Sequence, residues 1–514
     1  MADNLGSFKV FAQGGLNLNR DVLSQGETQP GSATTLINYE TAVTGGYRRV
    51  SGFSNDYGTV TGTGSVLGVA VANGINDGLL AARAPSSGNN YLHKWNSSTS
   101  SWDAVTTSGS PTMTGVTKVR FKRYNFGAGP KVILTDGINP AATYDGTTYT
   151  QITDSNAPTD PKFAEVFANH MFLAGDPAED YNLYFSIPDD ETNYDPGLGA
   201  GVYPVGFPIV ALKPFRDALY IFGINNIKRL VGNNKANFVL EHVTDDLGCL
   251  ASDSVVEIGG DLLFLSQDGI RPISGTNKIG DVQLESLSKN IQSLFTDVIL
   301  EEDLDALSSV VVRNKSQFRL FYDVDNANGL IGGLRLGQQG GINFEFGQLL
   351  GIEVTCADSA YIGQFEFVIH GDKSGKVHRQ EQGNNFGGNN IVSVYQTPFL
   401  HMQDPEQRKI IHTVATYLRS EGDNEIIMSV IYDYDDNTIL NPTNFALNTE
   451  GAAAFYNEAI FNTTAIFDGN PSPVQRVNVS GSGKSVSFRY VTNDTNAAHS
   501  IQGIVVTFGV GDRL

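Results

Sequence analysis

Cysteine is nearly absent from this chain of 514 residues, which contains only Cys249 and Cys356. The two residues are far apart and no CxxC pair occurs, so the sequence provides neither a disulfide framework nor a zinc-binding cysteine cluster. We therefore predict two small buried thiols in a protein made in a reducing cytosol.

Charged residues are also scarce, at 17% of the chain against about 25% for an ordinary soluble domain. The net charge is −21. Binding to nucleic acid phosphates requires clustered Lys and Arg, so this balance argues against a basic nucleic-acid binder. An acidic surface keeps a protein soluble and repels DNA.

Long apolar runs are missing too. No stretch reaches the roughly 18 apolar residues of a membrane-spanning helix. The segment Met1–Val10 lacks a basic region followed by an apolar core, so we expect no signal peptide and synthesis in a cytoplasm.

What the sequence does contain is 56 glycines and a recurring pattern of an apolar run, a Gly/Asp/Asn turn and a second short run. Three copies span 132–146, 215–232 and 258–275. Each is typical of two antiparallel strands joined by a tight hairpin, with the turn residues supplying a positive φ.

The apolar strands of these hairpins recur at intervals that scatter around the roughly 40–50 residues of a four-stranded propeller blade. We therefore predict an all-β fold with an irregular β-propeller of six or seven blades over 61–390. A stack of β-sandwiches is the competing geometry, but it would not require a long-period repeat. The centres of the repeated strands are Leu80, Val132, Phe172, Ile221, Phe264, Leu320 and Val368.

A short helical insertion is predicted near 286–308. Ile291, Leu294, Phe295 and Val298 follow helical spacing, and Ser288 stands at the expected N-cap. The acidic stretch 301–307 is predicted to continue as a second short helix.

The two ends of the chain differ from this repeat. Residues 1–60 carry too little apolar area to fold alone, so we expect an extended N-terminal arm lying on its own chain or on a neighbouring subunit. Residues 391–514 contain longer runs with clean alternation, which predicts an antiparallel β-sandwich domain.

Two sequence motifs resemble ligand-binding loops, but each departs from the pattern that its loop requires. The run 479–485 ends like a phosphate-binding loop, but Asn478 stands where that loop needs glycine and strand-like sequence lies on both sides. The run 323–329 has the wrong spacing for a calcium loop. No nucleophile elbow, metal spacing or carboxylate pair stands out, so we expect no enzyme, no metal and no cofactor.

The N-terminal elements Gly15-Leu-Asn, Leu36-Ile-Asn-Tyr-Glu40 and Gly46-Tyr-Arg-Arg-Val-Ser-Gly-Phe53 resemble the opening of tail nozzle (tail tubular) proteins of short-tailed bacteriophages, the podoviruses. The ending Ile501–Arg513 resembles their last strand, which closes with Gly-x-Arg. The resemblance touches both ends and the blade repeats between them, and its motifs are short and without catalytic content.

This resemblance implies a structural virion protein in the phage tail, assembled in the host bacterial cytoplasm. It would form a homo-oligomeric ring, usually a hexamer, below the adaptor (head-to-tail connector) protein, as a conduit and gate for genome ejection. DNA would pass through the lumen without specific binding. The resemblance also implies tail fibres as possible partners, and transient contact with the host cell envelope.

Two sets of residues are candidates for these roles. Acidic runs could line the lumen, or they could be solvated outer surface; the lumen candidates are Asp189, Asp190, Glu191, Glu301, Glu302 and Asp303. The N-terminal arm could dock on a neighbour; its candidates are Tyr47, Arg48, Arg49 and Phe53.

Two other functions stay open. A receptor-binding or glycan-cleaving tail propeller, like a tailspike, would suit the 20 tyrosines, although only Trp95 and Trp102 could provide tryptophan platforms for sugars. A soluble propeller enzyme would need the catalytic pattern that the sequence lacks.

Overall fold

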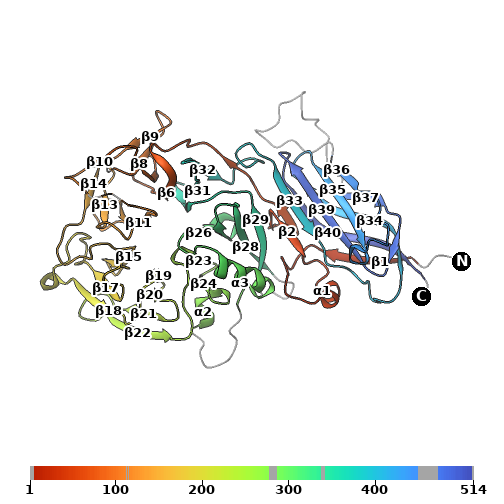
Figure 1. Cartoon of the computed structure of the whole chain (residues 1–514), viewed down its shortest axis with the longest axis horizontal. Helices are drawn as coiled ribbons and strands as arrows, with labels where there is room; N and C mark the ends of the chain where they lie inside the picture. Colours follow the sequence, from red (N-terminus) through yellow and green to blue (C-terminus); the bar gives the residue numbers. More distant parts are fainter. Residues whose placement is uncertain are drawn as a thin grey trace.

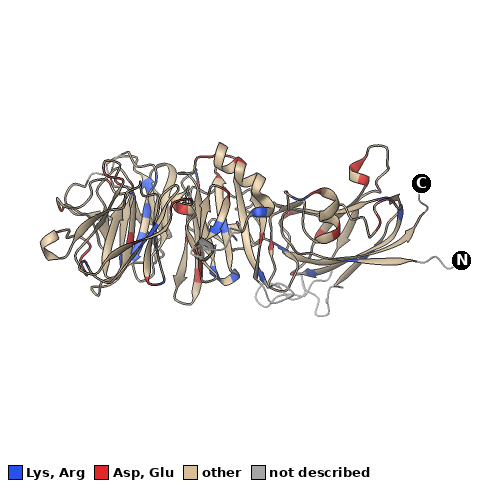
Figure 2. Ribbon diagram, turned by 90° about the horizontal axis from the view of Figure 1, so that it is seen from below, with Lys and Arg blue, Asp and Glu red and all other residues tan. Residues whose placement is uncertain are grey.

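The computed structural model describes residues 5–88, 90–111, 113, 115–276, 286–336, 342–449 and 473–511. The molecule is elongated, with a β-propeller at one end and a β-sandwich at the other, and both termini lie at the sandwich end (Figure 1). The view from below shows the same two parts side by side (Figure 2). The all-β prediction is confirmed.

Six small sheets form the blades of the propeller, as predicted from the repeat. Blade 1 consists of β6 (Thr63–Val71), β7 (Leu79–Ala84), β8 (Leu92–Asn96) and β9 (Ser101–Ala104). Blade 2 consists of β10 (Thr106–Thr107), β11 (Arg120–Tyr124), β12 (Lys131–Thr135), β13 (Ala142–Tyr144) and β14 (Thr148–Gln151). Blade 3 consists of β15 (Phe163–Phe167), β16 (His170–Ala174), β17 (Asn182–Phe185) and β18 (Gly201–Pro204).

Blade 4 again has four consecutive strands, whereas blades 5 and 6 are less regular. Blade 4 consists of β19 (Ala211–Phe215), β20 (Ala218–Phe222), β21 (Ile227–Val231) and β22 (Val239–Thr244). Blade 5 has three strands, β23 (Val256–Ile258), β24 (Asp261–Ser266) and β25 (Gly269–Pro272). Blade 6 consists of β30 (Cys356–Ile362), β31 (Phe365–Gly371), β32 (Val377–Gln380) and, from the N-terminal segment, β5 (Phe53–Ser54).

Between blades 5 and 6 the ring is closed by four strands of a larger, nine-stranded sheet. We call these strands the junction unit; they are β26 (Ser308–Val312), β27 (Gln317–Asp323), β28 (Asn328–Leu336) and β29 (Ile342–Leu350). The junction unit has the form of a further blade, and it continues into the sandwich.

The hairpins form because glycine at the turn can adopt a positive φ between two apolar strands, as the repeat predicted. The turn of 258–275 pairs Ser266 with Gly269, and Gly269 has a φ of +113°, which favours glycine. Apolar side chains cluster between successive blades, for example Leu80 of blade 1 with Leu134 of blade 2, both buried. Since each sheet buries both faces against its neighbours, the ring needs no separate core.

The sandwich has two sheets. One is the far part of the nine-stranded sheet, where the strand order after β29 is β2 (Thr35–Ile37), β33 (Ile391–Gln396), β39 (Val486–Asp494), β35 (Glu425–Tyr432) and β36 (Phe445–Asn448). The other has the order β3 (Tyr39–Thr41), β4 (Tyr47–Arg49), β40 (His499–Val510), β34 (Lys409–Ser420) and β37 (Val474–Asn478), with β1 (Gly6–Phe11) on β40 and β38 (Ser482–Gly483) on β34. The runs after residue 391 supply β33 to β40 of this sandwich, as predicted, and the other strands, β1 to β4, come from the N-terminal segment.

The N-terminal segment lies on its own chain, which was one of the two predicted arrangements, but its strands belong to both domains and do not form a separate arm. Strand β2 lies between β29 and β33 and joins the junction unit to the sandwich. Strands β1, β3 and β4 belong to the second sandwich sheet, and β5 completes blade 6. The segment lacks its own core because its side chains complete the cores of both domains.

The four docking-arm candidates are consequently engaged within their own chain. The Tyr47 side chain is buried and accepts a hydrogen bond from the Gly15 amide at 2.7 Å. Arg48 pairs with Glu40 at 3.0 Å and with Glu421 at 2.5 Å, and Arg49 pairs with Asp494 at 2.5 Å.

Phe53 lies edge-on to His370 and His378 and stacks on Phe386, with ring centroids 5.0, 4.9 and 5.6 Å away. It thereby anchors β5 in blade 6.

The helical insertion is only partly as predicted. A 3₁₀ turn at Lys289–Ile291 leads into α3 (Gln292–Glu301), and α1 (Val22–Thr28) and α2 (Ile273–Thr276) are shorter. Ser288 makes no capping hydrogen bond and instead accepts one from the Ile270 amide at 3.0 Å. The predicted acidic helix over 301–307 is wrong, because the chain turns there toward β26.

Candidate functional site: the central cavity of the propeller

A cavity of about 700 Å³ lies at the centre of the propeller. It is lined by the innermost strand of every blade and of the junction unit, namely β6, β11, β15, β19, β23, β26 and β30. Cavities at this position, where loops and strands from many blades converge, are common places for ligand sites.

One innermost strand carries a row of basic residues, which we call the basic stripe: Lys118, Arg120 and Lys122. Lys118 lies two residues before β11, and Arg120 and Lys122 lie in the strand. Because side chains alternate along a strand, residues two apart lie on the same side of the sheet. The stripe therefore presents three cations to blades 3, 4 and 5 around the cavity.

The first two cations of the stripe share Asp253. Arg120 binds its carboxylate through Nε at 3.0 Å and Nη2 at 2.8 Å, and Lys118 Nζ lies 2.6 Å from Oδ2. Arg120 Nη2 also donates to Ser252 Oγ at 2.9 Å. Burial by itself raises the pKa of Asp253, but Lys118 and Arg120 outweigh it and hold that pKa well below its ordinary value.

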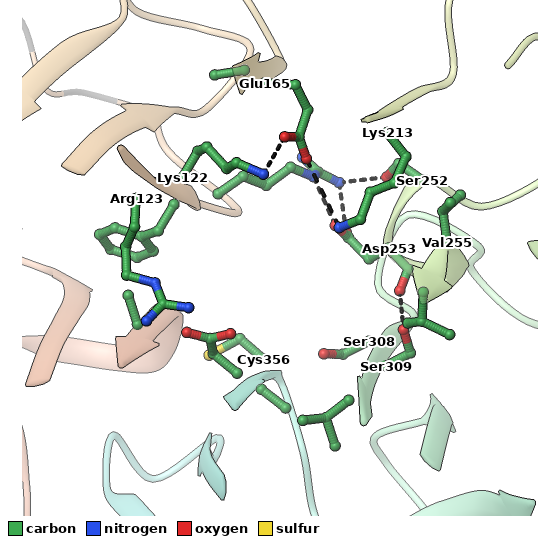
Figure 3. A pocket seen from close by; sticks show the side chains of 18 of the residues that line it. Lys122, Arg123, Glu165, Lys213, Ser252, Asp253, Val255, Ser308, Ser309 and Cys356 are labelled. Atoms are coloured by element: carbon green, nitrogen blue, oxygen red, sulfur yellow. Dashed lines mark hydrogen bonds and ion pairs between the residues drawn. The ribbon is translucent and has the colours of Figure 1, made fainter. Parts of the chain in front are cut away.

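The third cation of the stripe shares a carboxylate with a lysine of blade 4. Glu165 is buried and forms an ion pair with Lys122, while Lys213 Nζ lies 3.8 Å from Glu165 Oε1. Figure 3 shows the three side chains meeting at one side of the cavity. Burial lowers the pKa of Lys213, the nearby Glu165 raises it and Lys122 lowers it.

The lining is basic overall, in contrast to the acidic chain. Six basic residues line the cavity against four acidic ones. The basic residues are Lys118, Arg120, Lys122, Arg123, Lys213 and Arg313; the acidic residues are Glu165, Asp253, Glu257 and Asp358. The cavity can therefore attract anions although the whole molecule carries −21.

The Asp253 pair gives a pH-dependent prediction. A carboxyl group with a depressed folded-state pKa stabilises the fold above its unfolded pKa of about 3.9, and this contribution is lost as the pH falls. We expect Asp253→Asn to lower the free energy of unfolding by about 2 kcal/mol at pH 7. The difference in the free energy of unfolding between wild type and variant should shrink below about pH 4. Urea unfolding of both proteins between pH 7 and pH 3 measures this; a difference that is constant with pH would contradict it.

The predicted lumen residues do not line this cavity. Asp189, Glu301 and Asp303 are exposed and Asp190 and Glu302 half-exposed; Asp189 and Asp190 lie in the loop after β17, and Glu301 ends α3. Glu191 is buried and pairs with Lys131 at 2.6 Å, so its assignment to a lumen surface was wrong. For the other five, a role in a ring lumen stays a prediction.

The basic stripe was missed by the sequence reasoning, which considered net charge and acidic runs only. The signal was readable, because Lys-x-Arg-x-Lys over 118–122 has the period of a strand. Its acidic partners could not be read, since Asp253 lies in a 3₁₀ turn 133 residues from Arg120.

Other sequence predictions hold at the level of local structure. Cys249 and Cys356 are buried free thiols, and burial raises their pKa to about 11 and about 12. The run 479–485 connects β37 to β39 and contains the two-residue strand β38. In the calcium-like run, Asp323 accepts hydrogen bonds from Asn326 and Asn328 within its own turn.

In the part of the chain that the structure describes, no three His, Cys, Asp or Glu residues are placed to hold a metal ion together. No helix among the described residues is long and apolar enough to cross a membrane. Arg513, which closes the C-terminal motif, lies outside the described residues.

Comparison with known proteins gives no family. No family model and no curated protein matches the chain. Among solved structures, the extracellular domain of a protein described as a one-component system from B. thetaiotaomicron is 10% identical with a TM-score of 0.40, over 66% of this chain and 41% of that one. An exo-beta-1,3-galactanase from Phanerochaete chrysosporium, solved with galactose, is 10% identical with a TM-score of 0.26, over 89% of this chain and all of that one.

Proposed function

We propose that this chain is a structural subunit of the tail nozzle of a short-tailed bacteriophage. The observation that carries the proposal is the position of the motif 46–53, on which the resemblance to that family rests. Its residues form the connection between sandwich and propeller: β4 lies in the sandwich, and Phe53 begins the outer strand of blade 6. The motif is therefore a structural element rather than a catalytic one.

The connection between the two domains is built to resist deformation. A single sheet runs from the junction unit through β2 into the sandwich, so backbone hydrogen bonds cross the domain boundary. A buried ionic network around Glu40 crosses the same boundary, from β3 to β27. A subunit of a pressurised conduit needs such rigidity, because hinge motion between its domains would open the ring.

In this proposal the subunits form a ring, with six as the expected number, under the adaptor protein. The exposed acidic residues Asp189, Glu301 and Asp303 are then candidates for a lumen through which DNA slides without binding. Tail fibres and the host cell envelope are further proposed contacts, and the virion tail is the proposed location.

Electron microscopy of immunogold-labelled virions tests the proposal. An antibody against this chain should label the distal part of the tail tube. Labelling of side fibres or capsid instead would overturn it. Native mass spectrometry of the purified chain with its adaptor measures the ring number, and a trimer would favour a tailspike.

A receptor-binding propeller is a second candidate, favoured by one observation. A cavity of about 630 Å³ at blade 3 is lined by Tyr184, Tyr203, Asp176 and Glu179 among others. Aromatic rings beside carboxylates are common in sugar sites, whereas Trp95 and Trp102 are buried and unavailable. Binding on a glycan array that Tyr203→Ala abolishes would support this function; no binding to any glycan would reject it.

A further inference from the structure

Two cations in the central cavity have donors that the protein leaves unused. The Lys213 ammonium group makes no side-chain hydrogen bond among the described residues, and the Glu165 carboxylate oxygen with which it pairs is 3.8 Å away. The Arg123 guanidinium is exposed and forms no ion pair or hydrogen bond with the described part of the chain. Lysine has three donors and arginine five, so both can bind further acceptors.

None of the four acidic residues that line the cavity forms an ion pair with Arg123 in the described part of the chain, and only Glu165 lies within 4 Å of the Lys213 ammonium group. Glu257 is exposed and, with Asp358, raises the pKa of Lys213 from farther away. Glu165 already forms a close ion pair with Lys122. Asp253 is shared by Lys118 and Arg120, and Asp358 accepts a hydrogen bond from the Val71 amide at 2.8 Å. Partial burial lowers the pKa of Lys213, although its side chain is still 32% exposed. An additional negative charge in the cavity would stabilise its ammonium group.

The two cations come from different sides of the cavity. Arg123 lies on β11 of blade 2 and Lys213 on β19 of blade 4. Figure 3 shows the two side chains on different sides of the open space, Lys213 next to Glu165 and Arg123 across the cavity from it, with Ser308 from β26 on a third side. A ligand between them would need several acceptor oxygens spread over more than one direction.

We propose that the central cavity binds a small multivalent oxyanion, of the phosphate or polycarboxylate kind, held by Lys213 and Arg123 with Ser308 as a further donor. The volume of about 700 Å³ leaves room for such an anion with several waters. Charge-assisted hydrogen bonds to phosphate or carboxylate oxygens are the strong ones among protein hydrogen bonds. Acidic groups farther away than about 8 Å are largely screened at physiological salt. The charges that line the cavity therefore dominate the electrostatic attraction of an anion to it.

The alternative is that these basic residues only hold the blades together. Lys118, Arg120 and Lys122 have that role, since each bridges to a carboxylate on another element. Lys213 and Arg123 fit it poorly, because one has a single distant partner and the other has none among the described residues. Substituting these two should therefore remove anion binding while leaving the unliganded fold intact.

Isothermal titration calorimetry and thermal melting of the full chain test this. The probes are inorganic phosphate, citrate and tripolyphosphate, with KCl added to keep the ionic strength constant. We expect one saturable site per chain and a melting temperature that rises with anion concentration. Lys213→Gln and Arg123→Gln should each weaken binding about tenfold, the loss expected for one charge-assisted contact.

The matched controls are Lys9→Gln and Arg419→Gln, which remove exposed cations from the sandwich. They should bind the probes like the wild type. The unliganded melting temperatures of the two cavity variants should also equal that of the wild type. The proposal is overturned if none of the three anions binds saturably, if the cavity variants bind like the controls, or if only a single-stranded oligonucleotide binds. It does not depend on the nozzle assignment, which these measurements leave untouched.

Discussion

Replacing Glu40 by alanine is expected to lower the free energy of unfolding by about 3–5 kcal/mol, the usual effect of breaking a buried ion pair. The Glu40 side chain is only 2% exposed. It accepts from Arg48 at 3.0 Å, from Lys315 at 2.8 Å and from Gln317 at 2.8 Å, and Arg319 lies 3.8 Å away. Without Glu40, three cations would share Glu381 and Glu421 as their remaining carboxylate partners.

The same substitution should also uncouple the domains. Glu40 lies on β3 of the sandwich, and Gln317 and Arg319 lie on β27 of the junction unit. Tryptophan fluorescence reports on blade 1, where Trp95 and Trp102 lie, and far-UV circular dichroism reports on both domains. In urea the two signals should give different midpoints for Glu40→Ala.

The control for this prediction is Glu406→Ala. Glu406 is 78% exposed and pairs with Lys484 at 3.3 Å, so its loss should cost less than about 1 kcal/mol. Equal effects of the two substitutions would show that burial of the Glu40 network contributes nothing.

Gly46→Ala is expected to destabilise the protein more than Gly45→Ala by about 1–3 kcal/mol, the cost of overpacking. Both glycines have positive φ, +83° and +89°. A Cβ on Gly46 would lie 2.7 Å from the Gln502 Cα and still closer to the Ile501 carbonyl oxygen, whereas a Cβ on Gly45 meets nothing within 4 Å. Both atoms near Gly46 belong to the backbone of β40, so no side chain can move aside.

The neighbouring glycine is the control, since it has the same backbone strain without the contact. Gly45→Ala should lose only the cost of a positive φ, about 1–2 kcal/mol. Urea unfolding of the two variants under identical conditions gives the comparison. Similar stabilities of the two variants would mean that β40 can shift away from the turn. The close approach of β40 would then not explain why position 46 requires glycine.

The parts of the fold that were predictable depend on local sequence. A hairpin such as 258–275 is specified by its turn residues and by apolar runs a few positions apart, and the strands of 409–510 by their alternation. Repetition of hairpins at blade spacing then predicted the propeller. The path of the N-terminal segment was not predictable. Strand β2 pairs with two strands more than 300 residues away, and no local pattern in β2 specifies either partner.

For the candidate site, the amino-acid sequence is enough to show which residues carry charge and that Lys118, Arg120 and Lys122 recur with the two-residue period of a strand. It also shows that Gly46 to Phe53 form a compact motif. Which of these charges lie close together follows from the arrangement of the blades in space. Glu40 reaches Lys315 across 275 positions, Arg120 reaches Asp253, and Lys213 and Arg123 are left with unused donors. The physical reason is that closing a ring of blades brings their inner strands together, and this contact depends on the order of whole sheets rather than on any local pattern.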